Sequence, residues 1–179
     1  HMNRNGLCAI LALNKAVEDE SIGKNIAMQI ASAAPVASDE NGVAQSVKDN
    51  ELAVAIEKSK AEQVQKAVEA ALKKAGINPT HVDSEAHMES NMAKGWLTAE
   101  DVAKAKEIIA TVSAEKAANL PEAMIQNIAK GRLAKFLKEV CLVNQEFIMD
   151  SKKTVKDVLK ETDAALQITS FKRFTLRAE

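Results

Sequence analysis

The sequence predicts an α+β protein: a small antiparallel sheet packed on helices, with a long antiparallel helical hairpin inserted. Three observations indicate this fold class. A short apolar run near the start and an alternating apolar segment near the end have the pattern of strands. Between them, apolar residues recur at helical spacing over a long stretch. The 179 residues are 46% hydrophobic but only 3% aromatic, so alanine and aliphatic side chains must do most of the packing, as in close-set helices.

The first part of the core, residues 1–42, is predicted to contain one strand and one helix. Apolar residues fill both faces of the run at 6–13, which is typical of a strand covered on both sides. In "DESIGKNIAMQIASAAP", Ile22, Ile26 and Ile30 recur at helical spacing, and the final proline ends the helix.

The helical hairpin is predicted over residues 43–120, with arms at 43–75 and 99–118 and a small helical tip between them. Positions 47, 54, 61, 68 and 75 hold Val, Val, Ala, Val and Ala, a seven-residue repeat that indicates a coiled-coil seam. Gly76 and Gly95 can end the helices that precede them by adopting the left-handed conformation. Thr98, facing Asp101, resembles a capping box at the start of the second arm.

The second part of the core, residues 121–179, is predicted to contain a helix, a strand, a short helix and a closing strand. Pro121 begins the first helix, which leads into "KGRLAKFLKEVCLVNQEFI" and its strand-like end. The short helix in "DSKKTVKDVLKE" can be capped by Asp150, Ser151 or Thr154. The closing "LQITSFKRFTL" alternates in two registers, which a bulge or a strand covered on both faces would explain.

Charge and hydropathy argue against several classes of partner. The chain has 24 basic and 25 acidic residues, so there is no electrostatic case for nucleic acid or an anionic membrane as the main partner. No apolar run reaches the ~18 residues of a membrane span, and the first one fits a buried strand better than a signal peptide. We therefore expect a cytoplasmic protein in which Cys8 and Cys141 are reduced.

The usual catalytic motifs are absent from the sequence. It contains no G-x-x-x-x-G-K-[ST], G-x-G-x-x-G, H-E-x-x-H or C-x-x-C. His81 and His87 are more typical of exposed polar residues than of a metal site, and the basic residues of 130–138 are typical of a solvated helix face. That face lacks aromatic side chains to stack on bases. We predict no catalytic residue, metal or cofactor, and binding in place of chemical catalysis.

Three separated blocks resemble the C-terminal part of bacterial elongation factor Ts. The first is "IAMQIASAAP" at 26–35, which is similar to a family helix that runs I-A-M-[QH]-[IV]-A-A before a proline. The tail "ITSFKRFTL" resembles the closing strand of the family. The block between them matches at Gly131, Arg132, Lys135, Phe136, Glu139, Leu142, Gln145, Phe147, Asp150, Thr154 and Val155.

The resemblance implies a nucleotide exchange factor, not an enzyme. Family members bind the GTPase elongation factor Tu and release its GDP during protein synthesis, and the second half of their core docks on the third domain of Tu. Full-length members also carry a small N-terminal domain and a T-D-F-V motif that inserts beside the magnesium site of the GTPase. Neither is present here, so the chain looks like a C-terminal fragment.

The resemblance also implies a docking site at the start of the chain. A family histidine precedes the first strand in an H-x-x-[R]-x-G setting, which His1, Arg4 and Gly6 match. If His1 and Met2 are instead a cloning remnant, this match fails. The family hairpin serves dimer contacts in some members, so a homodimer through the hairpin is a further expectation. The alternative function is a self-association or scaffold module built on that hairpin.

Overall fold

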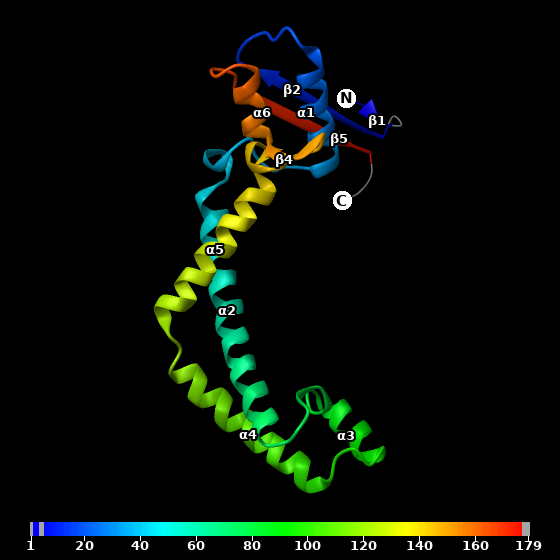
Figure 1. The fold of residues 1–179 in the computed structure, drawn as a ribbon, viewed down its shortest axis with the longest axis vertical. Coiled ribbons are helices and arrows are strands. Elements are labelled where there is room, and N and C mark those ends of the chain that lie inside the picture. Colours follow the sequence, from blue (N-terminus) through cyan, green and yellow to red (C-terminus); the bar gives the residue numbers. More distant parts are fainter. Residues whose placement is uncertain (1, 4–5, 177–179) are drawn as a thin grey trace. The chain divides into compact units, whose positions relative to one another are not determined.

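The computed structural model describes residues 2–3 and 6–176 of the chain (Figure 1). The chain forms two compact units: the first comprises His1–Glu51 and Arg132–Glu179, and the second comprises Leu52–Gly131. Every strand of the described residues belongs to the first unit, whereas the second contains helices and their connections.

The first and last long strands meet in one sheet, as the sequence predicts. β2 (Leu7–Leu13) pairs antiparallel with β5 (Ile168–Thr175), and β1 (Met2–Asn3) pairs with the start of β2 to give the order β1-β2-β5. The register shifts between Ala12 and Leu13, where β5 carries an extra residue. This bulge explains why the apolar alternation of the closing segment changes phase.

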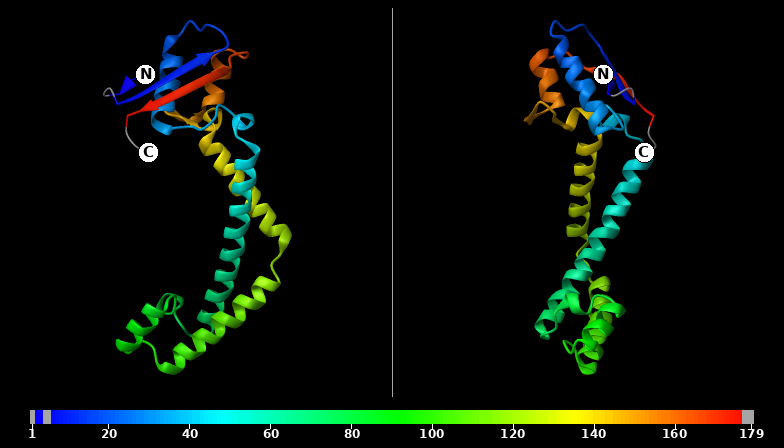
Figure 2. Two further views of the ribbon diagram at one scale, coloured as in Figure 1. Left: turned by 180° about the vertical axis from the view of Figure 1, so that it is seen from behind. Right: turned by 90° about the vertical axis from the view of Figure 1, so that its right-hand side faces the viewer.

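Helices α1 (Glu20–Ala33) and α6 (Val155–Thr162) lie against the same face of this sheet (Figure 2). Ile26 and Ile30 of α1 are fully buried there, and burying such a side chain contributes roughly 1.5–3 kcal/mol. Alternate residues of β2 face the same core. The buried members of this core are Ala9, Ile26, Ile30, Ala31, Leu142, Phe147, Val155, Val158, Leu159 and Leu166.

The prediction that the first strand is covered on both faces is wrong for the described residues. Ile10 of β2 is 59% exposed and Phe174 of β5 is 53% exposed. Both side chains lie on the opposite face of the sheet from Ala9, because successive residues of a strand point to opposite faces. The outer face of the sheet therefore exposes apolar side chains to solvent, beside the exposed Lys172, within the described chain.

A second, smaller sheet connects the core to α6. It consists of β3 (Glu146–Phe147) and β4 (Asp150–Thr154), which pair antiparallel with an irregular register. Thr154 is the cap of α6 among the three candidates. Its Oγ1 accepts a hydrogen bond from the Asp157 backbone N at 3.2 Å, and the Asp157 carboxylate accepts one from the Thr154 backbone N at 3.0 Å.

Short connections hold the remaining parts of the first unit. The 3-10 helices are η1 (Glu40–Gly42) and η3 (Leu142–Asn144). Ala37 and Cys141 form an isolated parallel bridge between the segments that lead into them. Ala37, Val43, Leu137 and Cys141 make a second small buried cluster beside this bridge.

The helices of the second unit begin and end close to where the sequence predicts. α2 (Gln45–Lys74) leads from the first unit into the second, and α5 (Glu122–Val140) leads back to the first. Between them in the sequence come η2 (Pro79–His81), α3 (Glu85–Ala93) and α4 (Ala99–Ala118). The glycines after α2 and α3 have φ of 78° and 77°, the left-handed conformation that ends a helix. The hydrophobic core of the second unit contains Leu72, Ile77, Val82, Met88, Leu97, Val102 and Ala105.

The predicted seven-residue seam of α2 is only partly correct. Val47 and Val54 are 41% and 44% exposed, whereas Ala55, Ser59 and Leu72 are buried. A strict seven-residue repeat drifts by ~20° per heptad around a straight α-helix, so its positions leave the covered face unless the helix supercoils. The covered stripe of α2 consequently follows the 3.6-residue period.

Candidate partner-binding surface

Besides Val36 and Val47, large apolar side chains are exposed in two regions of the first unit. One region is the outer face of the three-stranded sheet, and the other is the turn between β3 and β4. Monomeric proteins commonly expose single apolar residues, but adjacent ones mark surfaces that bind partners. The exposed large apolar residues of these two regions are Met2, Ile10, Ile148, Met149, Phe174 and Leu176.

A shallow hollow lies where β1, the start of β2 and the end of β5 meet. Its volume is ≈ 600 Å³, and its lining includes Gly6, Cys8, Phe174 and Leu176. The sequence analysis predicts three docking residues, and Gly6 is the one of them that the structure describes. His1 and Arg4 lie outside the described residues, so the structure does not test whether they approach Gly6.

The β3–β4 turn presents two adjacent apolar side chains, which the sequence analysis missed. Ile148 is 42% exposed and Met149 is 61% exposed. Residues that favour turns are usually Gly, Asn, Asp, Ser or Pro, so two large apolar residues at this position are unusual. That departure is the local signal of this surface, whereas the apolar run by itself predicts only the end of a strand.

The turn borders a second hollow, of ≈ 460 Å³, between α1, the end of α5 and β3. Lys135 and Lys138 line it together with Ile148, and Glu139 and Glu146 are also present. Neither lysine makes an ion pair within the described residues. An apolar turn beside two available ammonium groups suits a partner surface with an apolar pocket and an acidic rim.

The residues that carry the family resemblance lie mostly inside the first unit, where they hold its parts together. Gln145 is 8% exposed, and its Nε2 donates to the Glu139 carbonyl at 2.8 Å. Phe147 is buried in the main core. Arg173 lies on the inner side of β5 and its Nε donates to the Ala31 carbonyl at 3.0 Å, near the end of α1.

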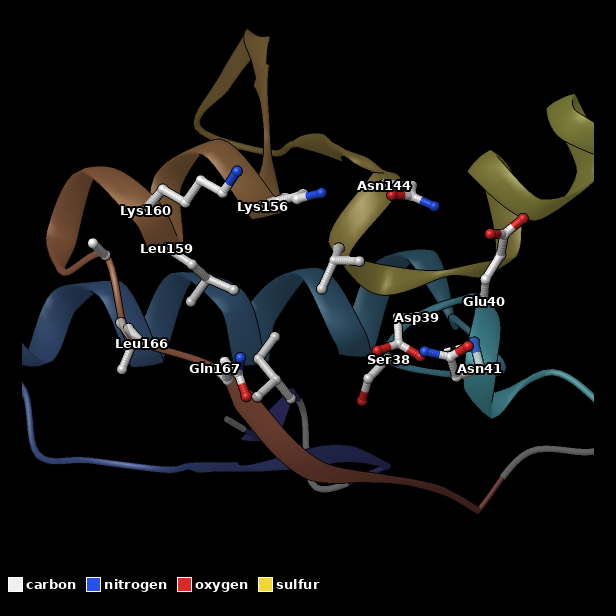
Figure 3. Close-up of a pocket in the computed structure, with 13 residues that line it drawn as sticks. Ser38, Asp39, Glu40, Asn41, Asn144, Lys156, Leu159, Lys160, Leu166 and Gln167 are labelled. Carbon is white, nitrogen blue, oxygen red and sulfur yellow. Dashed lines mark hydrogen bonds between the residues drawn. The ribbon is translucent and has the colours of Figure 1, made fainter.

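A third hollow, of ≈ 420 Å³, lies beside α6 (Figure 3). Lys156 and Lys160 line it from α6, and Asp39 and Glu40 line it from η1. The Asp39 carboxylate already accepts hydrogen bonds from the backbone N of the two residues that follow Glu40. The lining thus combines two lysines, two carboxylates and apolar side chains such as Leu159. This mixture of charges favours no single class of ligand.

The described residues contain no cluster suited to metal chemistry. Across 2–3 and 6–176, no group of three His, Cys, Asp or Glu side chains could hold a metal ion. Burial raises the pKa of the Cys141 thiol, and the nearby carboxylates of Glu40 and Asp39 raise it further. Within the same described ranges, every helix is too short or too polar to cross a membrane.

Comparison with known proteins agrees with the resemblance. The family model described as elongation factor TS matches the chain in two overlapping segments, residues 1–76 and 54–178. The chain therefore belongs to the elongation factor Ts family.

Three curated relatives match over the whole chain. The chain is 74% identical over 179 residues to the elongation factor Ts proteins of Bacteroides fragilis, Bacteroides thetaiotaomicron and Parabacteroides distasonis. Each match covers 100% of this chain and 54% of the relative. The chain thus spans about half the length of these relatives.

Proposed function

We propose that this chain is the part of a guanine nucleotide exchange factor that docks on elongation factor Tu. The family assignment supports this proposal, and the resemblance directs the docking to the third domain of Tu. One structural observation supports a particular binding surface. The turn Ile148–Met149 is apolar and exposed, and residues that carry the family resemblance form hydrogen bonds that hold it in place.

The turn has the chemistry of an interface centre. Methionine is enriched in protein–protein interfaces, whose buried centre is apolar and whose rim is polar. Met149 is the more exposed of the pair, and Lys135 and Lys138 lie along the adjoining hollow. Gly6 and the residues proposed with it, His1 and Arg4, form a second proposed contact at the start of the chain.

Exchange requires no chemical step in this chain. If the factor and the nucleotide bind the GTPase with negative coupling, the factor weakens GDP binding by the same ratio by which GDP weakens its own binding. Docking supplies binding free energy to this coupling. Disturbance of the nucleotide site must then come from residues that reach that site, such as the T-D-F-V motif implied by the resemblance.

Calorimetry with purified elongation factor Tu tests the docking directly. We expect the folded chain to bind Tu, and Met149→Ala to weaken binding about five- to thirtyfold, the range of an interface residue that matters. Met92→Ala is the matched control, because Met92 is 40% exposed but belongs to the second unit. Absence of binding at high micromolar concentration, or equal affinities for Met149→Ala and the unmodified chain, would overturn the proposal.

Release of a fluorescent GDP analogue from Tu tests the division of labour. The 179-residue chain contains no T-D-F-V sequence, so we expect it to bind Tu without accelerating release appreciably. Rapid release by this chain alone would mean that docking is sufficient for exchange.

Self-association through the helical hairpin stays a second prediction. The family assignment does not favour it as the main function, but the exposed Val47 and Val54 of α2 lie seven positions apart on one helix. Sedimentation over a wide concentration range tests it. A strict monomer at the highest concentration would exclude a dimer of this chain.

A further inference from the structure

The amide of Gln29 is a polar group placed deep in the core of the first unit. Gln29 belongs to α1, is 1% exposed, and lies between the fully buried Ile26 and Ile30 in the sequence of that helix. Burying an amide is unfavourable unless hydrogen bonds replace those it made with water. An aliphatic side chain would occupy this position at lower cost, so the partners of the amide explain its presence.

Those partners are backbone groups on either side of Phe147. The Gln29 Nε2 donates to the Glu146 carbonyl at 2.9 Å, and the Gln29 Oε1 accepts from the Ile148 backbone N at 3.1 Å. The Gln29 side chain therefore holds the backbone at two points: Glu146 in β3, and Ile148, the first residue of the turn. Phe147, between them, is anchored in the core.

A second glutamine extends the network to α5 and α6. The Gln29 Nε2 also donates to Gln145 Oε1 at 3.2 Å, and Gln145 Nε2 donates to the Glu139 carbonyl at 2.8 Å. The Gln145 carbonyl accepts from the Val155 backbone N at 3.0 Å. The segment that leads into the turn is thus tied to α1 and α5 through two glutamine side chains, and to α6 through a backbone hydrogen bond.

The turn has little secondary structure of its own to hold it. β3 contains only two residues, and its two pairs with β4 are separated by a register irregularity. An isolated two-stranded hairpin is marginally stable at best. The two hydrogen bonds to Gln29 therefore add a side-chain restraint, beside the short β3–β4 pairing, on the backbone that presents Ile148 and Met149.

We propose that Gln29 is a positioning residue for partner binding. It holds the Ile148–Met149 turn in the conformation that the partner recognises. A pre-ordered turn loses less conformational entropy on association, so the complex is tighter than with a mobile turn. This inference rests on the proposed function, because it takes the turn to be the contact with elongation factor Tu.

The direct test replaces Gln29 with methionine, which is similar in size and cannot form these hydrogen bonds. We expect Gln29→Met to accelerate exchange of the Ile148 amide hydrogen, measured by NMR, and to weaken Tu binding about tenfold, mainly through faster dissociation. Ile30→Val is the matched control: it removes a buried methyl group from the same helix and leaves the network intact.

A double-mutant cycle separates positioning from general destabilisation. If Gln29 acts through the turn, Gln29→Met should have little further effect on Tu affinity once Ile148 and Met149 are both alanine. Equal losses in the two backgrounds would overturn the inference, as would unchanged affinity of Gln29→Met despite faster Ile148 exchange. If the double-alanine variant itself binds Tu like the unmodified chain, the proposed docking surface fails instead.

A second variant covers the case in which Gln29→Met does not fold. Gln29→His keeps one donor and one acceptor in its neutral ring, so it can retain part of the network. We expect its Tu affinity to fall in proportion to the loss of Ile148 amide protection. Full affinity with an unprotected Ile148 amide would contradict the inference.

Discussion

The two capping boxes found in the described part of the chain allow a matched test of local helix stabilisation. Thr154 and Asp157 begin α6 in the first unit, and Thr98 and Asp101 begin α4 in the second. Both threonines have φ of −89° and ψ of 164°, and both boxes have reciprocal hydrogen bonds. Alanine at either threonine removes the acceptor for one backbone N–H and leaves the other helical residues unchanged.

The expected cost of Thr154→Ala is about 1 kcal/mol, within a range of roughly 0.5–2 for such caps. This corresponds to a reduction of about fivefold in the folding equilibrium of the first unit. We expect a value in the upper part of the range, because α6 has eight residues and its first residue, Val155, is fully buried in the core. Thr154→Ser keeps the hydroxyl group and should lose much less.

Residue-resolved hydrogen exchange in the native state measures the effect separately in each unit. Thr154→Ala should lower the protection of α6, and Thr98→Ala should lower that of α4. Urea unfolding followed by circular dichroism gives the corresponding free energy for the whole chain. If Thr154→Ala and Thr154→Ser lose the same stability, the hydroxyl group of the cap contributes nothing and the reasoning is refuted.

Three further predictions concern acid stability, thiol chemistry and the core. Hydrogen bonds from the Thr154 backbone N–H and hydroxyl group hold the pKa of Asp157 below 3.8, so its stabilising contribution is present above pH 3.8 and is lost as pH falls through the lowered pKa. Asp157→Asn should therefore flatten the acid side of the stability profile, and an unchanged profile would contradict this. A thiol reagent should modify the half-buried Cys8 in the folded chain, but Cys141 only after unfolding, because Cys141 is buried and burial raises its pKa. Peptide mapping that finds Cys141 modified first would contradict this. Leu142→Ala should cost about 2–5 kcal/mol in urea unfolding, because Leu142 is fully buried, and a cost under about 1 kcal/mol would be incompatible with that burial.

Local signals in the sequence predict the limits of the helices well. The second arm, predicted at 99–118, coincides with α4 (Ala99–Ala118). The Thr98–Asp101 box forms although glutamate is more usual in that position. Capping depends on residues three or four positions apart, so a single sequence contains the whole interaction.

Properties that depend on distant residues were not predictable in this way. The apolar residues of β2 do not reveal that only one face is covered, because Ile10 and Leu11 look equally suited to a core. The role of Gln145 is decided by Gln29, 116 positions away. The described structure also gives no reason for a glycine at position 131, because a Cβ at that position would meet no heavy atom within 4 Å.

The candidate site was predicted only in part. The resemblance directs attention to His1, Arg4 and Gly6, of which Gly6 alone is described and lines a hollow at the end of the sheet. Ile148 and Met149 were missed because exposure of an apolar pair depends on how the turn is held. Their identity is local, but the network that presents them is tertiary.

The pairing of β2 with β5 has a consequence for how the protein is made. Ala12 and Thr169, which share a hydrogen bond, are 157 positions apart, so the main sheet cannot close until Ile168–Thr175 has left the ribosome. The helical excursion between them contains mostly local contacts and can form earlier, whereas closing so long a loop is slow. Until then, the edge of Leu7–Leu13 that pairs with β5 stays open, and unpaired strand edges of this kind are what chaperones shield.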